Sequence, residues 1–139
     1  MKRVTIPGGR VTRMAGVTLI ELMVVVVIVA ILVSIAVPAY RSHVVKTNRK
    51  AAQSCLAEAA QYMERFYTTK LTYEDADPNP GCYSDANLGA RYTFEATPAP
   101  TQSAYTLTAT PKGPQVDTQC GVLSIKQDGA RSPTTPGCW

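Results

Sequence analysis

Hydrophobic residues are distributed very unevenly along this 139-residue chain. Residues 17–40 form an almost unbroken apolar run in which Glu21 is the only charged side chain. Because about 20 helical residues span the hydrocarbon core of a bilayer, this run predicts a transmembrane helix. A basic stretch precedes the run, but the run is too long for the core of a cleaved secretory signal and has no small-residue cleavage site after it.

Beyond residue 40 the apolar positions become periodic. They recur at spacings of three and four, which predicts one stripe of an amphipathic helix: Ala52, Cys55, Leu56, Ala59, Met63 and Phe66. The opposite face, which includes Arg49, Lys50 and Gln53, is expected to face solvent. We therefore expect one helix from about Thr18 to about Thr68, roughly 75 Å long.

Proline 38 interrupts this predicted helix near the end of the apolar run. Proline lacks a backbone donor and crowds the carbonyl group four residues earlier, here that of Ser34. A helix kink at Pro38 is therefore expected, as is common at proline within membrane helices.

The second half of the chain follows a period of two. Proline, glycine and polar residues dominate the segment after Thr69, which predicts an irregular loop. Apolar and polar residues then alternate in Arg91–Thr97 and Ala104–Thr110, and a shorter run, Gly121–Lys126, ends at the turn Gln127–Gly129. These runs predict a small antiparallel sheet with one apolar face, which the stripe of the long helix can cover. The predicted fold class is α+β.

The net charge of +4 comes from the N-terminal part of the chain. Four basic and no acidic residues lie in residues 1–16, whereas residues 51–139 hold six basic and nine acidic residues, a net charge of −3. This balance disfavours a head that grips nucleic acid over its whole surface. The basic cluster in residues 41–50, which includes His43, is best explained as a solvated helix face.

The four cysteines allow three pairings. We prefer the two pairs that are local in sequence, Cys55–Cys82 and Cys120–Cys138, because they would tie the loop to the helix and close a C-terminal loop. Spacings typical of zinc sites are missing, so no metal or cofactor is expected. Lysine and arginine counts on the two sides of the apolar run are equal, but disulfides favour a C-terminal part outside the cytoplasm.

The stretch Gly16–Glu21, followed by the apolar run, resembles the type IV pilin motif, also called the type III signal. The resemblance implies that a prepilin peptidase cleaves after Gly16 on the cytoplasmic side and N-methylates Val17. The segment Pro38–Tyr67 is similar to that of PilE-type minor pilins. Val17 stands where type IVa pilins usually have phenylalanine, and the 16-residue leader is longer than theirs.

The resemblance divides the chain into a cleaved leader (1–16), a transmembrane and filament-core helix (17–40) and a head (41–139). It implies a type IV pilin fold and a single-pass inner-membrane precursor with a periplasmic C-terminus, which later joins an extracellular pilus. The implied partners are other pilin subunits, the prepilin peptidase and the inner-membrane assembly machinery.

Glu21 would become the fifth residue of the mature chain. A carboxylate within the bilayer costs about 2.5–3.5 kcal/mol near the centre and less near the interface. In a filament, Glu21 can pair with the new amino group of Val17 on an adjacent subunit, and a buried charge without its partner is strongly penalised. Glu21 is therefore expected to set the axial register of assembly, the alternative being a carboxylate that only reaches the interface.

The sequence favours a structural protein and not an enzyme, because it has one histidine and no nucleophile–base constellation. The preferred function is a minor pilin that helps initiate a type IV pilus and is incorporated into it, serving adhesion, twitching motility or DNA uptake. The alternatives are a major pilin, a DNA-binding pilin and a minor pseudopilin of type II secretion. A periplasmic protein anchored by an uncleaved helix is the alternative outside this family.

Overall fold

A computed structural model describes residues 16–113, 115 and 117–139 of the chain. The expected leader therefore lies outside the described residues, except for Gly16. The chain separates into two compact units, residues 1–38 and residues 39–139, and each is described here by itself.

Helix α1 (Leu19–Lys70) is 52 residues long and contributes to both units. Its bounds agree with the predicted helix to within two residues at each end. Pro38 lies inside it, and the helical assignment continues through this residue. After Lys70 the chain turns at Leu71, which has a positive φ of 54°, and this change of backbone direction ends the helix.

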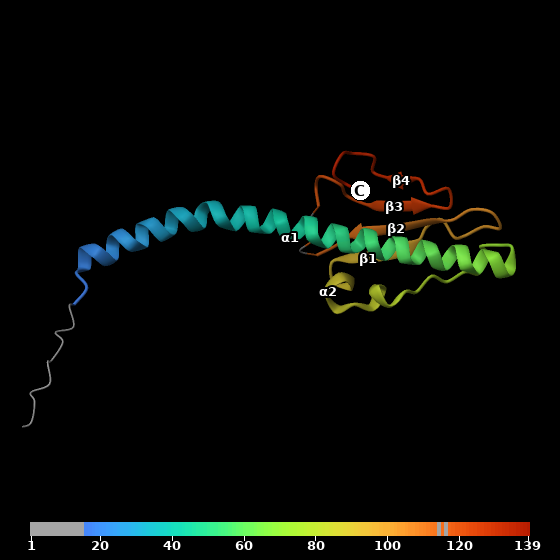
Figure 1. Ribbon diagram of the computed structural model, residues 1–139, viewed down its shortest axis with the longest axis horizontal. Helices are drawn as coiled ribbons and strands as arrows, with labels where there is room; N and C mark the ends of the chain where they lie inside the picture. The colour runs from blue at the N-terminus through green and yellow to red at the C-terminus, as the bar shows by residue number, and fades with distance from the viewer. Residues whose placement is uncertain (1–15, 114, 116) are drawn as a thin grey trace, which may run out of the picture. The chain divides into compact units, whose positions relative to one another are not determined.

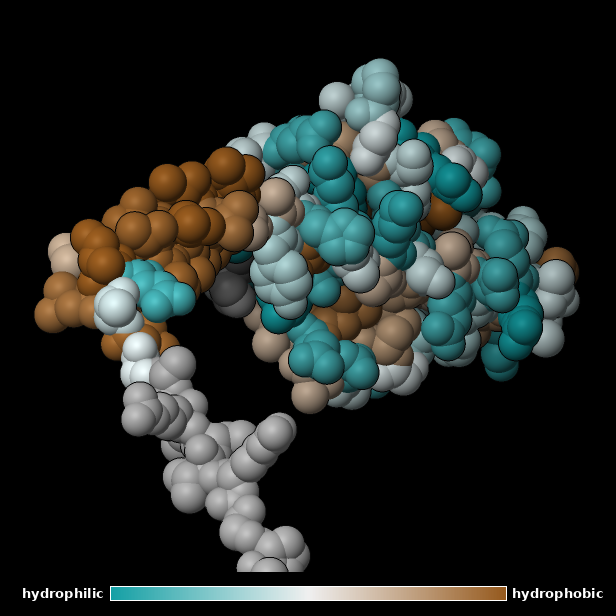
Figure 2. All heavy atoms as spheres, turned by 60° about the vertical axis from the view of Figure 1, so that its left-hand side comes forward, coloured by the Kyte–Doolittle hydropathy of each residue, from teal (hydrophilic) through white to brown (hydrophobic). Residues whose placement is uncertain are grey.

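The described part of the first unit is the first half of α1. It is the one described helix that is long and apolar enough to cross a membrane, and none of its most apolar window is buried. Figure 2 shows this segment as a largely hydrophobic surface, whereas hydrophilic residues predominate on the head. The apolar run has no partner within the described chain.

In the second unit the other half of α1 lies along a four-stranded antiparallel sheet (Figure 1). The strand order is β1-β2-β3-β4, so each strand pairs with its neighbour in sequence. The strands are β1 (Tyr92–Ala96), β2 (Thr106–Pro111), β3 (Leu123–Lys126) and β4 (Arg131–Ser132). The first three occupy the three predicted runs. The two-residue β4 was not predicted, because it is too short to show an alternating pattern.

The core lies between α1 and the sheet. From the helix come the predicted stripe residues Ala52, Cys55, Leu56, Ala59 and Met63, all at most 2% exposed, with Phe66 partly buried. The sheet contributes alternating residues, as period-two patterning requires: Tyr92, Leu107, Ala109, Leu123 and Ile125. The predicted interface between the helical stripe and the apolar face of the sheet is therefore confirmed.

The loop between α1 and β1 contains two short helices, η1 (Gly81–Ser84) and α2 (Ala86–Gly89). The Asp85 carboxylate begins α2 by accepting hydrogen bonds from the backbone N–H groups of Asn87 and Leu88, each 2.9 Å long. Leu88 is buried and joins the core. The sequence predicted only an irregular loop here, because helices of one turn have no periodicity to detect.

Candidate functional site

The first candidate region is the assembly segment, which we define as residues 16–38. At its start, Gly16 is exposed, and a Cβ added there would meet no described atom within 4 Å. Its φ is not in the left-handed region that favours glycine. The described fold therefore does not require glycine at this position.

Thr18 and Glu21 form the start of α1. The Glu21 backbone N–H donates a 3.3 Å hydrogen bond to the Thr18 hydroxyl oxygen. Thr-x-x-Glu at a helix start is the pattern of a capping box, and a carboxylate in the first turn also complements the helix dipole. The printed cap is the bond to the Thr18 hydroxyl, which uses the Glu21 backbone and not its carboxylate.

The apolar side chains of the assembly segment are exposed all around the helix. Leu19 is 78% exposed and even Val37, at the end of the run, is 41% exposed. At roughly 25 cal/mol per Å² of apolar surface, such a helix is strongly driven to bury itself in lipid or against other helices. The described chain itself provides no cover for this surface.

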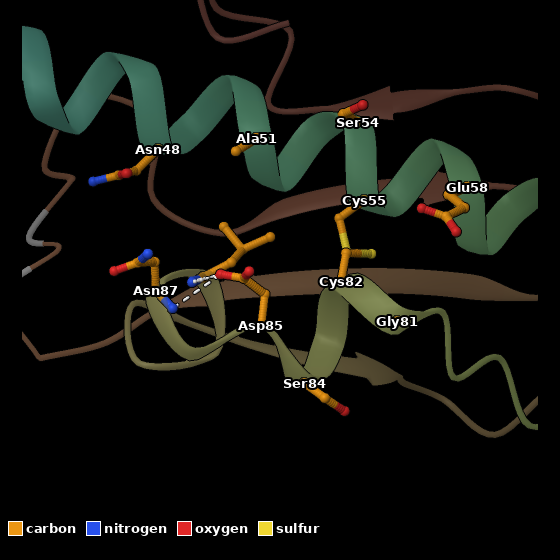
Figure 3. A pocket seen from close by; sticks show the side chains of 11 residues that line it. Asn48, Ala51, Ser54, Cys55, Glu58, Gly81, Cys82, Ser84, Asp85 and Asn87 are labelled. Carbon is orange, nitrogen blue, oxygen red and sulfur yellow. Dashed lines mark hydrogen bonds between the residues drawn. A yellow bond between two sulfur atoms is a disulfide. The ribbon is translucent and has the colours of Figure 1, made fainter.

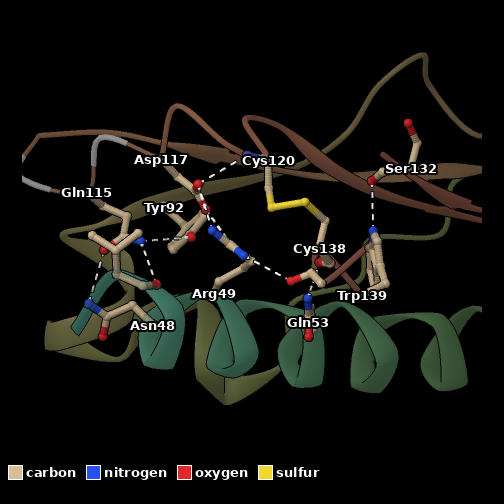
Figure 4. A network of polar contacts seen from close by, with 12 residues as sticks. Asn48, Arg49, Gln53, Tyr92, Gln115, Asp117, Cys120, Ser132, Cys138 and Trp139 are labelled. Atoms are coloured by element: carbon tan, nitrogen blue, oxygen red, sulfur yellow. Dashed lines mark hydrogen bonds and ion pairs between the residues drawn. A yellow bond between two sulfur atoms is a disulfide. The ribbon is translucent and has the colours of Figure 1, made fainter. Parts of the chain in front are cut away.

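The second candidate region is a polar network at the start of the head (Figure 4). The Arg49 guanidinium donates to both oxygens of the Asp117 carboxylate, at 2.6 and 2.8 Å, and a further 3.0 Å bond reaches the Gly137 carbonyl oxygen. Arg49 and Asp117 side chains are 4% and 1% exposed. Burial by itself would raise the pKa of Asp117, but the hydrogen bonds from Arg49 and from the Cys120 N–H lower it overall.

Gln115 extends this network toward the beginning of α1. It is 1% exposed, and its amide donates to the Val45 carbonyl oxygen at 3.0 Å and to the Tyr92 hydroxyl at 3.2 Å. Its own amide oxygen accepts from Asn48 at 3.1 Å. Gln53 donates to the Cys138 carbonyl oxygen. Four helical residues thus bind two distant C-terminal segments to α1.

The expectation that Arg49 and Gln53 face solvent was wrong. Arg49 is buried and Gln53 is half-buried. The expectation rested on helical periodicity, in which a charged residue beside the apolar stripe falls on the solvated face. Asp117, whose carboxylate neutralises the buried Arg49 guanidinium, is 68 residues away in sequence. No local pattern reveals this partner. By contrast, His43 and Lys50 are exposed as expected.

Two disulfides fix the loops of the head. They join Cys55 to Cys82, with Cα atoms 5.9 Å apart, and Cys120 to Cys138, with Cα atoms 5.5 Å apart. These are the two sequence-local pairs predicted above. The first ties η1 to α1, and the second ties the C-terminus to the segment that carries Asp117. Trp139 is half-buried beside Cys138 and donates a 2.9 Å bond to the Ser132 carbonyl oxygen.

Aromatic residues surround Glu64 on the last turns of α1. The Glu64 carboxylate accepts hydrogen bonds from the hydroxyl groups of Tyr73 (3.1 Å) and Tyr105 (3.0 Å). Burial and these bonds raise the pKa of both tyrosines above the ordinary value. Tyr73 lies in the core, whereas Tyr62 is 41% exposed.

A hollow of about 620 Å³ lies between α1 and the η1–α2 loop, beside the Cys55–Cys82 disulfide (Figure 3). Its titratable side chains are Glu58 and Asp85, and the Asp85 carboxylate is occupied in capping α2. Among the described residues, no three histidine, cysteine or acidic side chains are grouped to hold a metal ion. The hollow is therefore a surface groove without a catalytic constellation.

A family described as "Type IV minor pilin ComP, DNA uptake sequence receptor" matches residues 38–124, and the prokaryotic N-terminal methylation motif matches residues 12–37. The chain belongs to this type IV pilin family. Pilins are structural proteins and not enzymes, as expected from the sequence.

Relatives of this pilin agree with the assignment. The type IV major fimbrial protein FimA of Dichelobacter nodosus is 30% identical over 108 residues, which cover 76% of this chain and 66% of FimA. This pilin thus matches slightly less than two thirds of that relative's length. A type IV pilin from Shewanella oneidensis is 31% identical with a TM-score of 0.54, over 68% of this chain and 97% of that chain.

A further solved structure shares the fold alone. The non-core minor pilin PilV of Neisseria meningitidis has a TM-score of 0.50 and 24% identity, over 70% of this chain and 95% of that one. Together with the methylation motif, these matches confirm the type IV pilin fold that was predicted: a long N-terminal apolar helix, a small antiparallel sheet and a disulfide near the C-terminus.

Proposed function

We propose that this pilin is a minor subunit that helps initiate a type IV pilus and is incorporated into it. The observation that carries the proposal is the exposed apolar surface of the assembly segment, which lies within the region that matches the methylation motif. A surface of this kind is stable only in a bilayer or against similar helices. Membership of a family described as minor pilins supports the low-abundance role.

Processing is proposed to occur between Gly16 and Val17. The prepilin peptidase would remove residues 1–16 and methylate Val17, which exposes the amine that Glu21 of a neighbouring subunit pairs with. The lack of any conformational need for glycine at position 16 supports recognition by an enzyme. A kink at Pro38 would let the helix bend as it enters the filament.

The precursor is proposed to span the inner membrane once, with its C-terminus in the periplasm. Two disulfides in a head of about 100 residues support an oxidising compartment. Extraction by the inner-membrane assembly machinery would then move the subunit from the bilayer into an extracellular pilus among other pilins.

The minor role is tested by deletion and by counting subunits. Loss of the gene should reduce the number of pili per cell, and peptides of the head should be present in sheared filaments at a small fraction of the dominant pilin. If instead its peptides dominated the filaments, it would be the major pilin. Complementation with a Lys50→Ala variant, which changes an exposed head residue, is the control for expression.

DNA binding is a second candidate function, because the matched family is described as a DNA uptake sequence receptor. The net charge of −3 in residues 51–139 opposes it, but exposed cations gather locally. Arg65 and Lys126 line one hollow, and Arg131 lies 5.2 Å from the Trp139 ring. Cations near a partly exposed aromatic ring suit a nucleic-acid backbone and base.

Charge removal tests this second function. The double variant Lys126→Ala and Arg131→Ala should weaken duplex binding by the pilin and lower the slope of log affinity against log salt by about 2. A double variant of exposed acidic residues, Glu74→Ala and Asp75→Ala, should not weaken it. Unchanged affinity in the cationic variant would contradict a contact at this surface.

A further inference from the structure

Cations from separate parts of the chain meet at the beginning of the head. Arg41 on α1 and Arg91, which precedes β1, line one hollow together with Tyr40, Val44, Val45 and Gln115. Lys112 adjoins Arg91, because its backbone N–H donates a 2.8 Å bond to the Arg91 carbonyl oxygen. Arg41 and Lys112 are exposed and Arg91 is half-buried. Arg91 and Lys112 are 50 or more positions from Arg41 in sequence, so only the fold brings the three residues together.

No acidic residue lines this hollow. The neighbouring hollow is lined by Lys46 and, among acidic residues, only by Asp117. The Asp117 charge is already balanced by Arg49 at 2.6 Å. Within the described residues, the cations around these two hollows therefore present uncompensated positive charge.

This cluster lies close in sequence to the membrane segment. Arg41 directly follows the apolar run of residues 17–40, and Tyr40 at the end of that run is 70% exposed. Tyrosine at the end of a transmembrane segment favours the headgroup layer. A cation near a surface of anionic lipid gains about 1 kcal/mol, and the attraction fades within a Debye length of about 10 Å.

We propose that Arg41, Lys46, Arg91 and Lys112 bind the headgroups of anionic phospholipids and so dock the head on the bilayer before assembly. The proposal rests on the membrane anchoring proposed above. The lipid contacts belong to the subunit before it joins a filament, because they must be released when the pilin leaves the membrane. The apolar floor formed by Val44 and Val45, beside Tyr40, suits the interface region of a bilayer.

The test uses the full chain in nanodiscs of phosphatidylcholine, with or without phosphatidylglycerol, carrying a trace of gadolinium-labelled lipid headgroup. Docking should increase the paramagnetic relaxation of the Lys112 and Gly113 amide signals in discs that contain phosphatidylglycerol. Arg91→Glu with Lys112→Glu should reduce the docked population at least roughly tenfold. The matched control, Lys126→Glu with Arg131→Glu, makes the same charge change away from the cluster and should leave docking intact.

Other results would overturn the proposal. Equal relaxation in both lipid compositions, or a loss of docking in the control as large as in the Arg91/Lys112 variant, would show no specific anionic contact.

Should the Arg91/Lys112 variant fail to fold, wild-type protein in high salt gives the same test, and docking that survives about 1 M salt would contradict the proposal. If duplex DNA shifted these amides while phosphatidylglycerol did not, the cluster would be a nucleic-acid surface. A chain that stayed out of the discs would overturn the anchoring as well.

Discussion

Arg49 and Asp117 are joined by two hydrogen bonds across 68 residues of sequence, and both side chains are almost completely buried. The pair connects the helix to the segment that the Cys120–Cys138 disulfide closes, and Arg49 also binds the Gly137 carbonyl oxygen. A single arginine thus holds both ends of the C-terminal loop against α1. In this pilin head, the C-terminal loop is positioned by the same helix that carries the exposed apolar run.

Replacing Arg49 by methionine should destabilise the head by about 3–5 kcal/mol, because it leaves the Asp117 carboxylate buried without its partner. Replacing both residues, as in Arg49→Met with Asp117→Leu, should cost less than the single change. Urea unfolding of disulfide-intact protein measures both values. The control is Lys50→Met at the adjacent exposed position, whose free energy of unfolding should stay within about 0.5 kcal/mol of wild type. A loss as large as that of Arg49→Met would contradict the stabilising role given to the buried ion pair.

The Asp117 ion pair also predicts how stability depends on pH. The folded pKa of Asp117 lies below its ordinary value, so the unfolded chain binds a proton first. The stabilisation is fully present above about pH 4 and is lost as the pH falls through the folded pKa. The melting temperature should therefore fall more steeply between neutral and strongly acidic pH in wild type than in Asp117→Asn. Parallel curves of melting temperature against pH would contradict this.

The two disulfides should contribute similarly to stability. They close loops with sequence separations of 27 and 18 residues, and the chain-entropy relation gives about 3–4 kcal/mol for each. Replacing either pair by serine should lower the free energy of unfolding by that amount, as measured in urea. Loss of Cys120–Cys138 should additionally increase amide exchange around Asp117. No change in exchange there would show that Arg49 holds the loop without help.

Glu64 should influence the titration of two tyrosines. Burial first, and then the bonds to Glu64, raise the pKa of Tyr105 and Tyr73. Glu64→Gln removes the negative charge, so both pKa values should move part of the way back toward 10, as followed by tyrosinate absorbance. Glu58→Gln, an exposed change on the same helix, is the control. An unchanged titration would show that burial alone raises the pKa values of Tyr73 and Tyr105.

The proposed register role of Glu21 can be separated from helix capping by substitution. Glu21→Gln keeps a side chain suited to a capping box but removes the charge, whereas Glu21→Ala removes both. If pairing with the Val17 amine sets axial register, both variants should insert in the membrane and both should be incorporated into filaments at least roughly tenfold less than wild type, since a lost charge pair costs several kcal/mol. Normal incorporation of Glu21→Gln would leave capping as the only role of Glu21.

Much of the fold could be predicted because its determinants are local. The stripe from Ala52 to Met63 and the alternation in β1 and β2 each follow from a single period, and both describe the core correctly. The preference for neighbouring cysteines also gave the observed pairs. The assembly segment is the most predictable region, because a long apolar run with one carboxylate has few structural interpretations.

The polar network could not be predicted because its members depend on distant partners. Arg49 resembles any exposed arginine beside an apolar stripe until Asp117 is placed opposite it. Gln115 similarly shows no pattern in sequence, yet it is buried and bonded to Asn48, Val45 and Tyr92. The meeting of Arg41 with Arg91 has the same origin, since strand order and not sequence spacing brings them to one hollow.

Cleavage after Gly16 and retention of the apolar helix in a filament are the central proposals for this pilin. Mass spectrometry of sheared surface filaments tests this by searching for a peptide that begins at N-methylated Val17. We expect this peptide to be present at a small fraction of the amount of the dominant pilin. Finding only chains that retain residues 1–16, confined to the cell envelope, would contradict it and would indicate an anchored periplasmic protein.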